Sequence, residues 1–391
     1  MSMDIKKRAE ELQPYLQKLR RDFHRHPETS FCERETAGRI LSELADIGGY
    51  EIKKNVNGTF GIIAELKGCG DGDLTALRAD MDALSIKEET GLDYASENPG
   101  VMHACGHDNH ITMLLGAARL LSETKGSWKG TVRLIFQPAE ELAPKGGSRT
   151  MIEGGALDKA DHVFGLHVWP SLPTGILGVR DGFQMAASDH FKIHFEGLSS
   201  HAAEPEKGRD SLMAGVEFVH NLKSSISQYV SKDDPVVLTI GEFHAGTRYN
   251  IVAGSCDIEG TCRTYSSEMH SKCEMLTRSF VEEISLKTGC KNTFNWEKGY
   301  DALKNDPSEA AYMRNCMEQL FGSEAVTIPE KGAMTAEDFS FYLEHTPGAF
   351  GWIGTSAEGS GPAALHSSRY APDEDVLWRG AGLLAALVIA R

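Results

Sequence analysis

The expected order of helices and strands changes near Ser188, and no other feature of the sequence limits the possible folds as strongly. Before this point helices and strands alternate, as in the helix Ile111–Leu121 and the strand Val132–Phe136, which indicates an α/β sheet covered by helices on both faces. From residue 188 to residue 299 the pattern predicts strand, helix, strand, strand, helix, strand. This is the order of the split, ferredoxin-like unit.

We therefore predict an α/β protein of two domains. Residues 1–187 and 300–391 are expected to form a discontinuous domain with a mixed sheet covered by helices, and residues 188–299 an inserted ferredoxin-like α+β domain. The length of 391 residues agrees with this division, because one hydrophobic core rarely serves a chain of that size. From this layout we expect the inserted domain to act as a lid that closes over a substrate.

Local patterns add elements to the first domain. An amphipathic helix is expected from near Ile5 until Pro27 stops it, and a second helix from Glu33 to Leu44. Two strand-like runs, Phe60–Leu66 and Leu74–Leu77, flank a glycine-rich segment. Because that segment opens no helix, we predict a hairpin turn here rather than a phosphate-binding loop.

The composition excludes several partners. The formal net charge of −16 at pH 7 argues against nucleic acid and anionic membranes. No apolar run is long enough to cross a bilayer, and the charged N-terminal segment lacks the apolar stretch of a signal peptide. Eight cysteines without framework spacing suit reduced thiols. We therefore expect a cytoplasmic protein that binds neither nucleic acid nor membrane.

The segment His103–His110 carries the strongest chemical signal. Cys105 and His107 lie two residues apart, so on an extended segment they can point to one side and hold the same ion. A thiolate also has enough lone pairs to bridge two ions. The alternative is a polar loop with a packed cysteine, and the segment alone does not decide between the two.

Further candidate ligands follow other expected strands. Glu140 and Glu141 come after the strand Val132–Phe136, at the end where α/β sheets place their sites. Adjacent carboxylates point in different directions, so one can bind metal while the other acts as a general base. His167 ends another strand, and His366 follows a glycine-rich loop. His167 and His366 are unremarkable alone. Together with the His103–His110 segment and the Glu140–Glu141 pair they make four candidate segments in one domain, which favours a metal site.

Six stretches resemble the amidohydrolase family that contains hippurate hydrolase, indole-3-acetyl-amino acid hydrolase and N-acetyl-diaminopimelate deacetylase, within the wider group of two-metal aminoacylases and carboxypeptidases. These stretches are Phe23–Glu28, Arg78–Leu84, His103–Asp108, Gln137–Glu141, Gly165–Val168 and Ala336–Phe339. The sequence departs from the family pattern at Glu206, where histidine is usual, and at Ser85, where proline is usual. Neither residue is an expected ligand, although both changes can affect substrate preference.

The resemblance implies five metal ligands, namely Cys105, His107, Glu141, His167 and His366. In the family pattern the cysteine bridges two ions. His107 and His167 complete one site, and Glu141 and His366 complete the other. The expected general base is Glu140. The wider group has a ligating histidine at the position of Asp80. Here that histidine is replaced, and its role as a ligand passes to His107. Asp82 is therefore expected to orient a ligating histidine rather than to bind metal.

The inserted domain carries three more resemblances. His201 matches the residue that stabilises the oxyanion, often in the partner subunit's site, which implies a homodimer. Asn250 and Arg263 match the pair that holds the carbonyl and carboxylate of the substrate, and the fork of an arginine suits a carboxylate. Without the resemblance, Arg263 would be interpreted as a charge at a strand edge.

The expected function is metal-dependent hydrolysis of the amide bond of an N-acyl amino acid, with an acetyl, benzoyl or related acyl group. Two divalent ions lower the pKa of a shared water to about 7, and Glu140 would take its proton and return it to the departing amine. Zinc or manganese is the expected metal, with cobalt and nickel as alternatives.

Three other interpretations stay open. A dipeptidase or carboxypeptidase would use the same two-metal site. A cysteine hydrolase would use Cys105 as nucleophile with His103 or His107 as base, which would leave the other candidate ligands without a role. A non-catalytic binding protein is expected to lack a ligand or the base, whereas this sequence has all of them.

Overall fold

The computed structural model describes residues 4–231, 234–356 and 364–391, which form two compact units. The first unit contains the chain up to Gln184, together with Lys304–Lys331 and the segment from Asp338 to Arg391. The second unit contains Met185–Leu303 and the short segment Gly332–Glu337.

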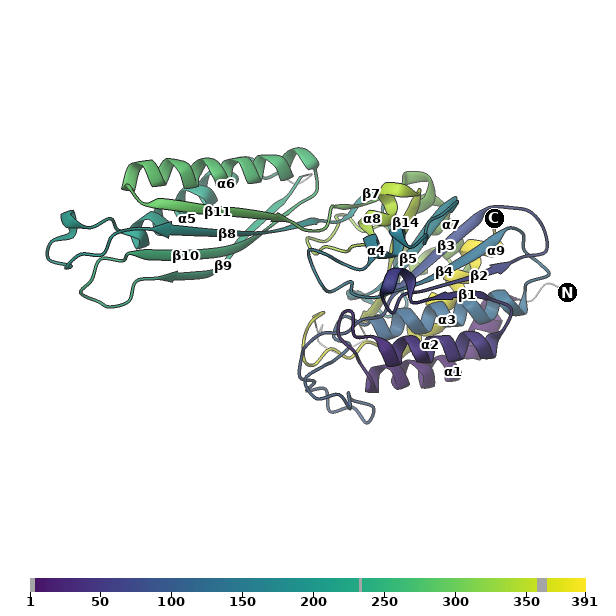
Figure 1. The fold of residues 1–391 in the computed structure, drawn as a ribbon. Helices are drawn as coiled ribbons and strands as arrows, with labels where there is room; N and C mark the ends of the chain where they lie inside the picture. Colours follow the sequence, from purple (N-terminus) through teal and green to yellow (C-terminus); the bar gives the residue numbers. More distant parts are fainter. Residues whose placement is uncertain (1–3, 232–233, 357–363) are drawn as a thin grey trace. The chain divides into compact units, whose positions relative to one another are not determined.

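The first unit is built on an eight-stranded mixed sheet with the strand order β1-β2-β4-β3-β5-β14-β6-β13 (Figure 1). The strands are β1 (Glu51–Lys54), β2 (Ile62–Lys67), β3 (Leu74–Asp80), β4 (Thr131–Gln137), β5 (His162–Pro173), β6 (Leu177–Gly178), β13 (Val326–Thr327) and β14 (Gly348–Ser356). β4, β3, β5 and β14 run parallel, and β1 and β2 join one side in antiparallel pairs. The carboxyl ends of the four parallel strands therefore lie along one edge of the sheet.

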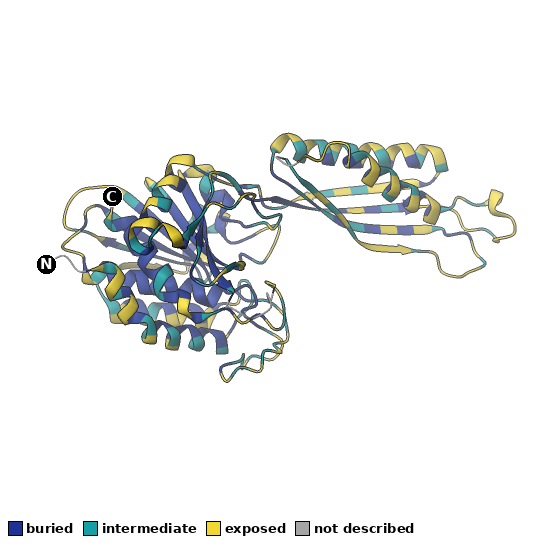
Figure 2. Cartoon of the chain, turned by 180° about the vertical axis from the view of Figure 1, so that it is seen from behind, coloured by how far each residue is buried: buried dark blue, intermediate teal, exposed yellow. Residues whose placement is uncertain are grey.

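Helices of the first unit bury the sheet and one another. They are α1 (Ile5–Arg25), α2 (Arg34–Ile47), α3 (His107–Glu123), α4 (Ser148–Glu153), α7 (Pro307–Phe321), α8 (Ser340–His345) and α9 (Leu377–Ile389). α3 packs against α1, α2 and α9, and it is buried over nearly its whole length (Figure 2). From Gly380 onward α9 contains only apolar residues, which suits a helix that packs within the core.

The predicted hairpin between the strand-like runs near residues 60 and 77 is wrong. β2 and β3 do not pair with each other, because β4 lies between them, antiparallel to β2 and parallel to β3. The glycine-rich connection instead bonds to the segment before β4, where the N–H groups of Gly68 and Cys69 donate to the carbonyls of Gly130 and Trp128. The connection thus crosses the end of a third strand.

The second unit has the predicted ferredoxin-like order. Its antiparallel sheet has the strand order β11-β8-β10-β9, and two helices cover one face (Figure 1). The elements are β8 (Ala187–Glu196), α5 (Ser211–Ile226), β9 (Val236–Ala245), β10 (Ser255–Thr264), α6 (Ser267–Thr288) and β11 (Lys291–Lys298). A short separate ribbon pairs β7 (Gly182–Met185) with β12 (Leu303–Asn305).

Alternation of side chains explains the core of the second unit. Phe191, Ile193 and Phe195 of β8 point to the helices and are buried, while the residues between them are partly or fully exposed. The side chains of Asp210 and Ser266 accept backbone N–H groups at the first turns of α5 and α6, so both helices begin at capping residues. Among the described residues, no helix combines the length and apolar character needed to span a membrane.

Candidate metal centre

The carboxyl ends of neighbouring strands bring the predicted site residues of the first unit together. Asp82 follows β3, Glu140 and Glu141 follow β4, and His167 lies within β5. These three strands are adjacent and parallel, so the residues meet at one edge of the sheet. His107 is the first residue of α3 and lies directly after Gly106.

Gly106 allows the cysteine and the histidine beside it to approach the same point. Its φ is +88°, a conformation that glycine adopts without strain, and an added Cβ would lie 2.5 Å from a methyl carbon of Val168. The tight packing therefore requires glycine here and places Cys105 and His107 close to β5.

The five predicted ligands form two groups that share the sulfur of Cys105. In each group one donor atom from every residue lies within 4.8 Å of the others, and the groups are Cys105, His107 and His167, and Cys105, Glu141 and His366. The Cys105 Sγ atom is 3.5 Å from Nε2 of His167, and Nε2 of His366 is 3.1 Å from Oε1 of Glu141. The backbone N–H of His366 donates to the carbonyl of Ala104, so a hydrogen bond holds His366 next to the segment that contains Cys105.

Hydrogen bonds fix which ring nitrogen of each buried histidine faces the centre. Nδ1 of His167 lies 2.6 Å from the carbonyl oxygen of Val168, so Nδ1 carries the proton and Nε2 presents a lone pair toward Cys105. Nδ1 of His107 lies 3.3 Å from Asp82, which leaves its Nε2 directed toward Glu141 at 3.9 Å. Imidazoles held in this way are typical of metal ligands.

Two of the inward-facing atoms test whether a cation fits. His107 Nε2 and Glu141 Oε1 are both buried and make no hydrogen bond, although nitrogens of His107 and His366 lie 3.9 and 3.1 Å from this oxygen. Leaving buried polar atoms unpaired is costly, and a cation between them would satisfy both. Sulfur, imidazole nitrogen and carboxylate oxygen together are a donor set for divalent transition metals. The residues present therefore fit two such ions.

Acidic side chains dominate the electrostatics of the centre. Burial and the carboxylates of Glu141 and Glu140 raise the pKa of the Cys105 thiol well above its ordinary value. Burial lowers the pKa of His107, but Asp80 and Asp82 outweigh this effect and raise it to about 10. A thiolate at this position therefore needs nearby positive charge, which argues against Cys105 as an independent nucleophile.

Glu140 lies beside the two groups. It is 6% exposed, and one of its carboxylate oxygens is within 4.8 Å of donor atoms of His107 and Glu141. Its backbone N–H donates to Oδ1 of Asp82 at 3.1 Å, and the N–H of Glu141 donates to Oδ2 of Asp82 at 3.0 Å. Asp82 therefore holds the backbone of the carboxylate pair.

A buried polar network lies beside His107, and the sequence analysis assigned no role to its members. Arg78 donates to Asp80 at 2.6 Å and to Asp338 at 2.9 Å. Asp80 accepts a hydrogen bond from Nδ1 of His110 at 2.6 Å, and Nε2 of His110 accepts the N–H of Val168 at 2.9 Å. Arg78, Asp80 and Asp338 lie in the stretches Arg78–Leu84 and Ala336–Phe339, which resemble the family. That resemblance is the sequence signal that could have identified them.

The predicted substrate residues His201, Asn250 and Arg263 lie in the second unit. His201 and Asn250 are neighbours on paired segments, because the N–H of Ala202 donates to the carbonyl of Asn250. The N–H of Ala203 donates to Nδ1 of His201 at 3.1 Å, so the neutral ring carries its proton on Nε2 and can donate from there. Arg263 lies near the other end of β10, and its Nε donates to Thr261 at 3.2 Å.

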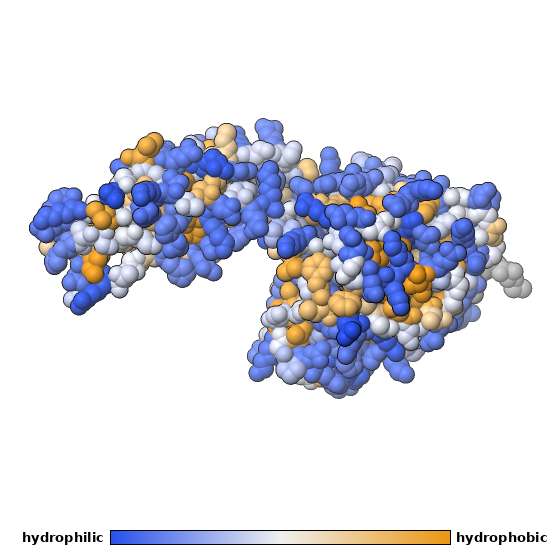
Figure 3. Space-filling model, in the orientation of Figure 1, coloured by the Kyte–Doolittle hydropathy of each residue, from blue (hydrophilic) through white to orange (hydrophobic). Residues whose placement is uncertain are grey.

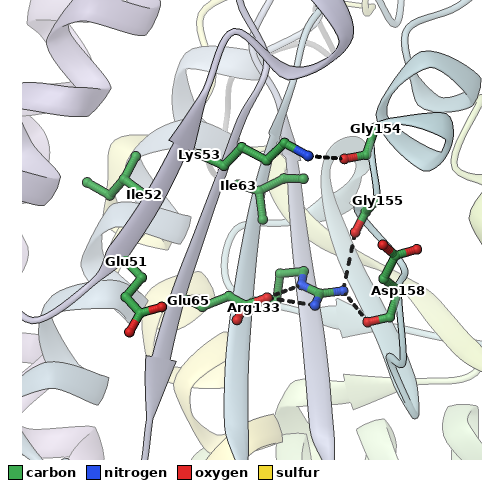
Figure 4. A pocket seen from close by; sticks show the side chains of 9 residues that line it. All are labelled: Glu51, Ile52, Lys53, Ile63, Glu65, Arg133, Gly154, Gly155 and Asp158. Carbon is green, nitrogen blue, oxygen red and sulfur yellow. Dashed lines mark hydrogen bonds and ion pairs between the residues drawn. The ribbon is translucent and has the colours of Figure 1, made fainter.

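A separate hollow of 370 Å³ lies on the first unit, along β1, β2 and the start of β4 (Figure 4). Its cations are already paired, since Arg133 donates to Glu65 at 2.7 Å and to the carbonyl of Asp158 at 2.8 Å, and Lys53 donates to the carbonyl of Gly154 (Figure 4). It also lies at the amino end of β4, whereas Glu140 follows the carboxyl end. We therefore assign no chemistry to this hollow.

Comparison with known proteins gives consistent matches over the whole chain. The model of peptidase family M20/M25/M40 matches residues 76–390. An N-acetylcysteine deacetylase from Bacillus subtilis is 36% identical over 371 residues, covering 95% of each chain. Thermostable carboxypeptidase 1 from Saccharolobus solfataricus is 34% identical over 388 residues, covering 98% of this chain and 97% of its own.

A solved structure agrees with these relatives. A Bacillus subtilis protein described as a dinuclear metal binding peptidase from the M20 family has a TM-score of 0.83 and 34% identity, covering 97% of this chain and 98% of its own.

Proposed function

The chain belongs to peptidase family M20/M25/M40 and is a metal-dependent hydrolase, and from this premise we propose that it hydrolyses the amide bond of an N-acyl amino acid. The observation that carries the proposal is the pair of donor groups that share Cys105, with Glu140 beside them. The curated relatives include a deacetylase of an N-acetyl amino acid, which supports this substrate class. A carboxypeptidase activity is the second candidate, because another relative is named for it.

The five proposed ligands would hold two divalent ions, and Cys105 belongs to both donor groups. When bound, the ions supply positive charge that polarises the substrate carbonyl and acidifies water. The mixed sulfur, nitrogen and oxygen donors suit zinc, and manganese, cobalt and nickel accept the same donors. We propose zinc or manganese as the metal.

Glu140 would move the proton during hydrolysis. Its carboxylate is buried beside the donor groups, while Asp82 fixes its backbone. It would take the proton of the attacking water and return it to the nitrogen of the departing amino acid, so one residue would serve as base and then as acid. Glu141 is a separate side chain on the next residue, so it would be available as a ligand while Glu140 moves the proton.

The second unit would supply the remaining contacts. Nε2–H of His201 would donate to the developing oxyanion, beside Asn250. Arg263 would hold the carboxylate of the amino acid with its guanidinium fork. The carbonyl of Asn250 accepts the N–H of Ala202, so Asn250 lies beyond the start of β10 at Ser255. Ser255 is eight residues from Arg263, which corresponds to about 26 Å along a strand.

This separation supports a homodimer in which two copies share each site. A small acyl amino acid is much shorter than 26 Å, so the two ends of one β10 strand serve it poorly together. β9 is an edge strand, and apolar side chains are exposed on it and on α5. Figure 3 shows apolar patches among polar ones on the surface of the second unit. These exposed residues are Leu212, Met213, Val216, Val237 and Phe243. We propose that this surface pairs two chains and that His201 acts in the partner's site, with the second unit closing over the substrate.

A cytoplasmic location is also proposed. The support is that all eight cysteines are free in the structure, which suits a reducing compartment.

One experiment tests the proposed function directly. Purified protein is analysed for bound metal and then assayed with N-acetyl, benzoyl and indoleacetyl amino acids, and with dipeptides and C-terminally blocked peptides, with and without added manganese. We expect acyl amino acids to be cleaved, with release of free amino acid. Cleavage of peptides alone would replace this proposal with the carboxypeptidase, and cleavage of neither class at full metal occupancy would contradict both.

A further inference from the structure

Ala139, the residue before Glu140, has an unusual backbone conformation. Its φ is +56°, in the left-handed region that residues other than glycine rarely adopt. The turn directs the chain from β4 into the carboxylate pair, so its geometry decides where Glu140 and Glu141 point. Something outside the turn must hold it, because alanine alone does not favour it.

The carboxyl group of Glu33 makes the contact that holds this turn. Oε1 of Glu33 accepts the backbone N–H of Ala139 at 2.9 Å, across 106 positions of the sequence. Glu33 is fully buried, and its other oxygen has no hydrogen-bond partner. Burial, with a contribution from Asp82, raises the pKa of Glu33 to about 7. A buried carboxyl group is costly to maintain, so this contact calls for an explanation.

Glu33 does not serve its own helix. It occupies the cap position before α2, but its side chain makes no capping bond there. Glu28 does so instead, since its carboxylate accepts the N–H of Thr36 at 2.8 Å and the hydroxyl of Thr36 at 2.9 Å. Glutamate is also not among the residues preferred at this position. Helix capping therefore does not account for Glu33.

Three consecutive N–H groups of the turn are held by two buried carboxyl groups. Glu33 holds Ala139, while Oδ1 and Oδ2 of Asp82 hold Glu140 and Glu141. The turn that carries the general base and one ligand is thus fixed at every amide.

We propose that Glu33 is a positioning residue for the reaction, acting through Ala139 to set the direction of Glu140 and Glu141. The proposal rests on the proposed function of the site. It requires only that the side chain at position 33 accept a hydrogen bond, so Glu33→Gln retains the contact through its amide oxygen and Glu33→Ala loses it.

The test compares steady-state kinetics of the metal-loaded variants. We expect Glu33→Ala to lower kcat by about 10- to 100-fold with little change in KM, as for other residues behind a metal site. We expect Glu33→Gln to restore most of kcat, and Ala139→Gly to restore part of it in the Glu33→Ala background, because glycine adopts the left-handed turn unaided. Glu28→Ala is the matched control, which removes a helix cap, lowers the melting temperature and leaves kcat unchanged.

Hydrogen exchange gives a readout that does not depend on activity. The amides of residues 138–141 should exchange faster in Glu33→Ala and at the wild-type rate in Glu33→Gln. If the wild-type protein cleaves no acyl amino acid, the proposed function fails while the exchange rates still test Glu33. The inference would be overturned if Glu33→Ala had the same kcat and the same amide exchange rates as the wild type. It would also be overturned if Glu28→Ala lost as much kcat as Glu33→Ala. Should Glu33→Ala not fold, Glu33→Asp, which is too short to reach Ala139, takes its place.

Discussion

Oδ1 of Asp82 lies 3.3 Å from Nδ1 of His107 and belongs to a carboxylate that is 1% exposed. The same oxygen accepts the backbone N–H of Glu140. One carboxyl oxygen therefore orients a proposed metal ligand and the proposed general base together, so the two cannot move independently.

Replacing Asp82 with alanine should weaken both functions. We expect metal affinity to fall by about 10- to 100-fold and kcat to fall as well, because the ring of His107 and the backbone of Glu140 lose their common partner. Metal titration followed by kinetics at saturating metal measures the two effects separately. Ser30→Ala, which removes one hydrogen bond to the other oxygen of Asp82, is the control and should change little.

Glu140→Gln should separate metal binding from turnover. The amide keeps the shape of the side chain but cannot accept a proton, so we expect kcat to fall by about 10²- to 10⁴-fold with unchanged metal content. Elemental analysis and kinetics on the same preparation check this. Near-normal turnover at full occupancy would remove Glu140 from the role of base.

Metal removal should distinguish the metal mechanism from a cysteine hydrolase. A chelator is expected to abolish activity, and added zinc or manganese to restore it. Alkylating reagents should modify Cys105 slowly in the metal-loaded protein, since Cys105 is 7% exposed, whereas Cys32 and Cys69 are exposed and should react readily. Activity that survives the chelator and disappears on alkylation would favour the nucleophilic cysteine.

A mixed dimer should show whether His201 acts across the interface. Neither Glu140→Gln nor His201→Ala chains are expected to be active alone. In the mixed dimer, the chain that retains Glu140 receives His201 from its partner, so about half of the wild-type activity should return because one of two sites is intact. If His201 serves its own chain, both sites of the mixed dimer are defective and no activity returns.

Acid should destabilise the first unit through Glu88. Burial alone raises the pKa of Glu88, but hydrogen bonds from His24, Thr90 and the N–H of Ser96 outweigh it and lower the pKa from 4.5 to about 2. The folded protein thus favours the ionised form, and this stabilisation is complete above pH 4.5 and lost as the pH falls toward 2. Denaturant unfolding across this range should show a smaller loss of free energy in Glu88→Gln than in the wild type.

Local patterns made the second unit predictable. Strand alternation such as that of Phe191, Ile193 and Phe195 and capping residues such as Asp210 are signals within a few positions of the element that they define. The donor groups of the first unit were expected because short motifs carried the resemblance, and the structure brings those residues together.

Pairings between distant segments were not predictable from the sequence. Nothing near residue 70 indicates that β4 inserts between β2 and β3, which is why a hairpin was expected there. No nearby sequence pattern predicts the contact of Glu33 with Ala139 either, because the sequence around Glu33 indicates only the start of a helix. Such contacts depend on the assembled sheet rather than on the neighbouring residues.

The place of β14 between β5 and β6 has a consequence for synthesis on the ribosome. β14 is made only after the whole second unit, so a nascent chain carries β5 with an open edge while the inserted unit can already fold. An open, apolar edge favours pairing with other chains. Translation pauses before Gly348 should therefore increase aggregation and dependence on chaperones.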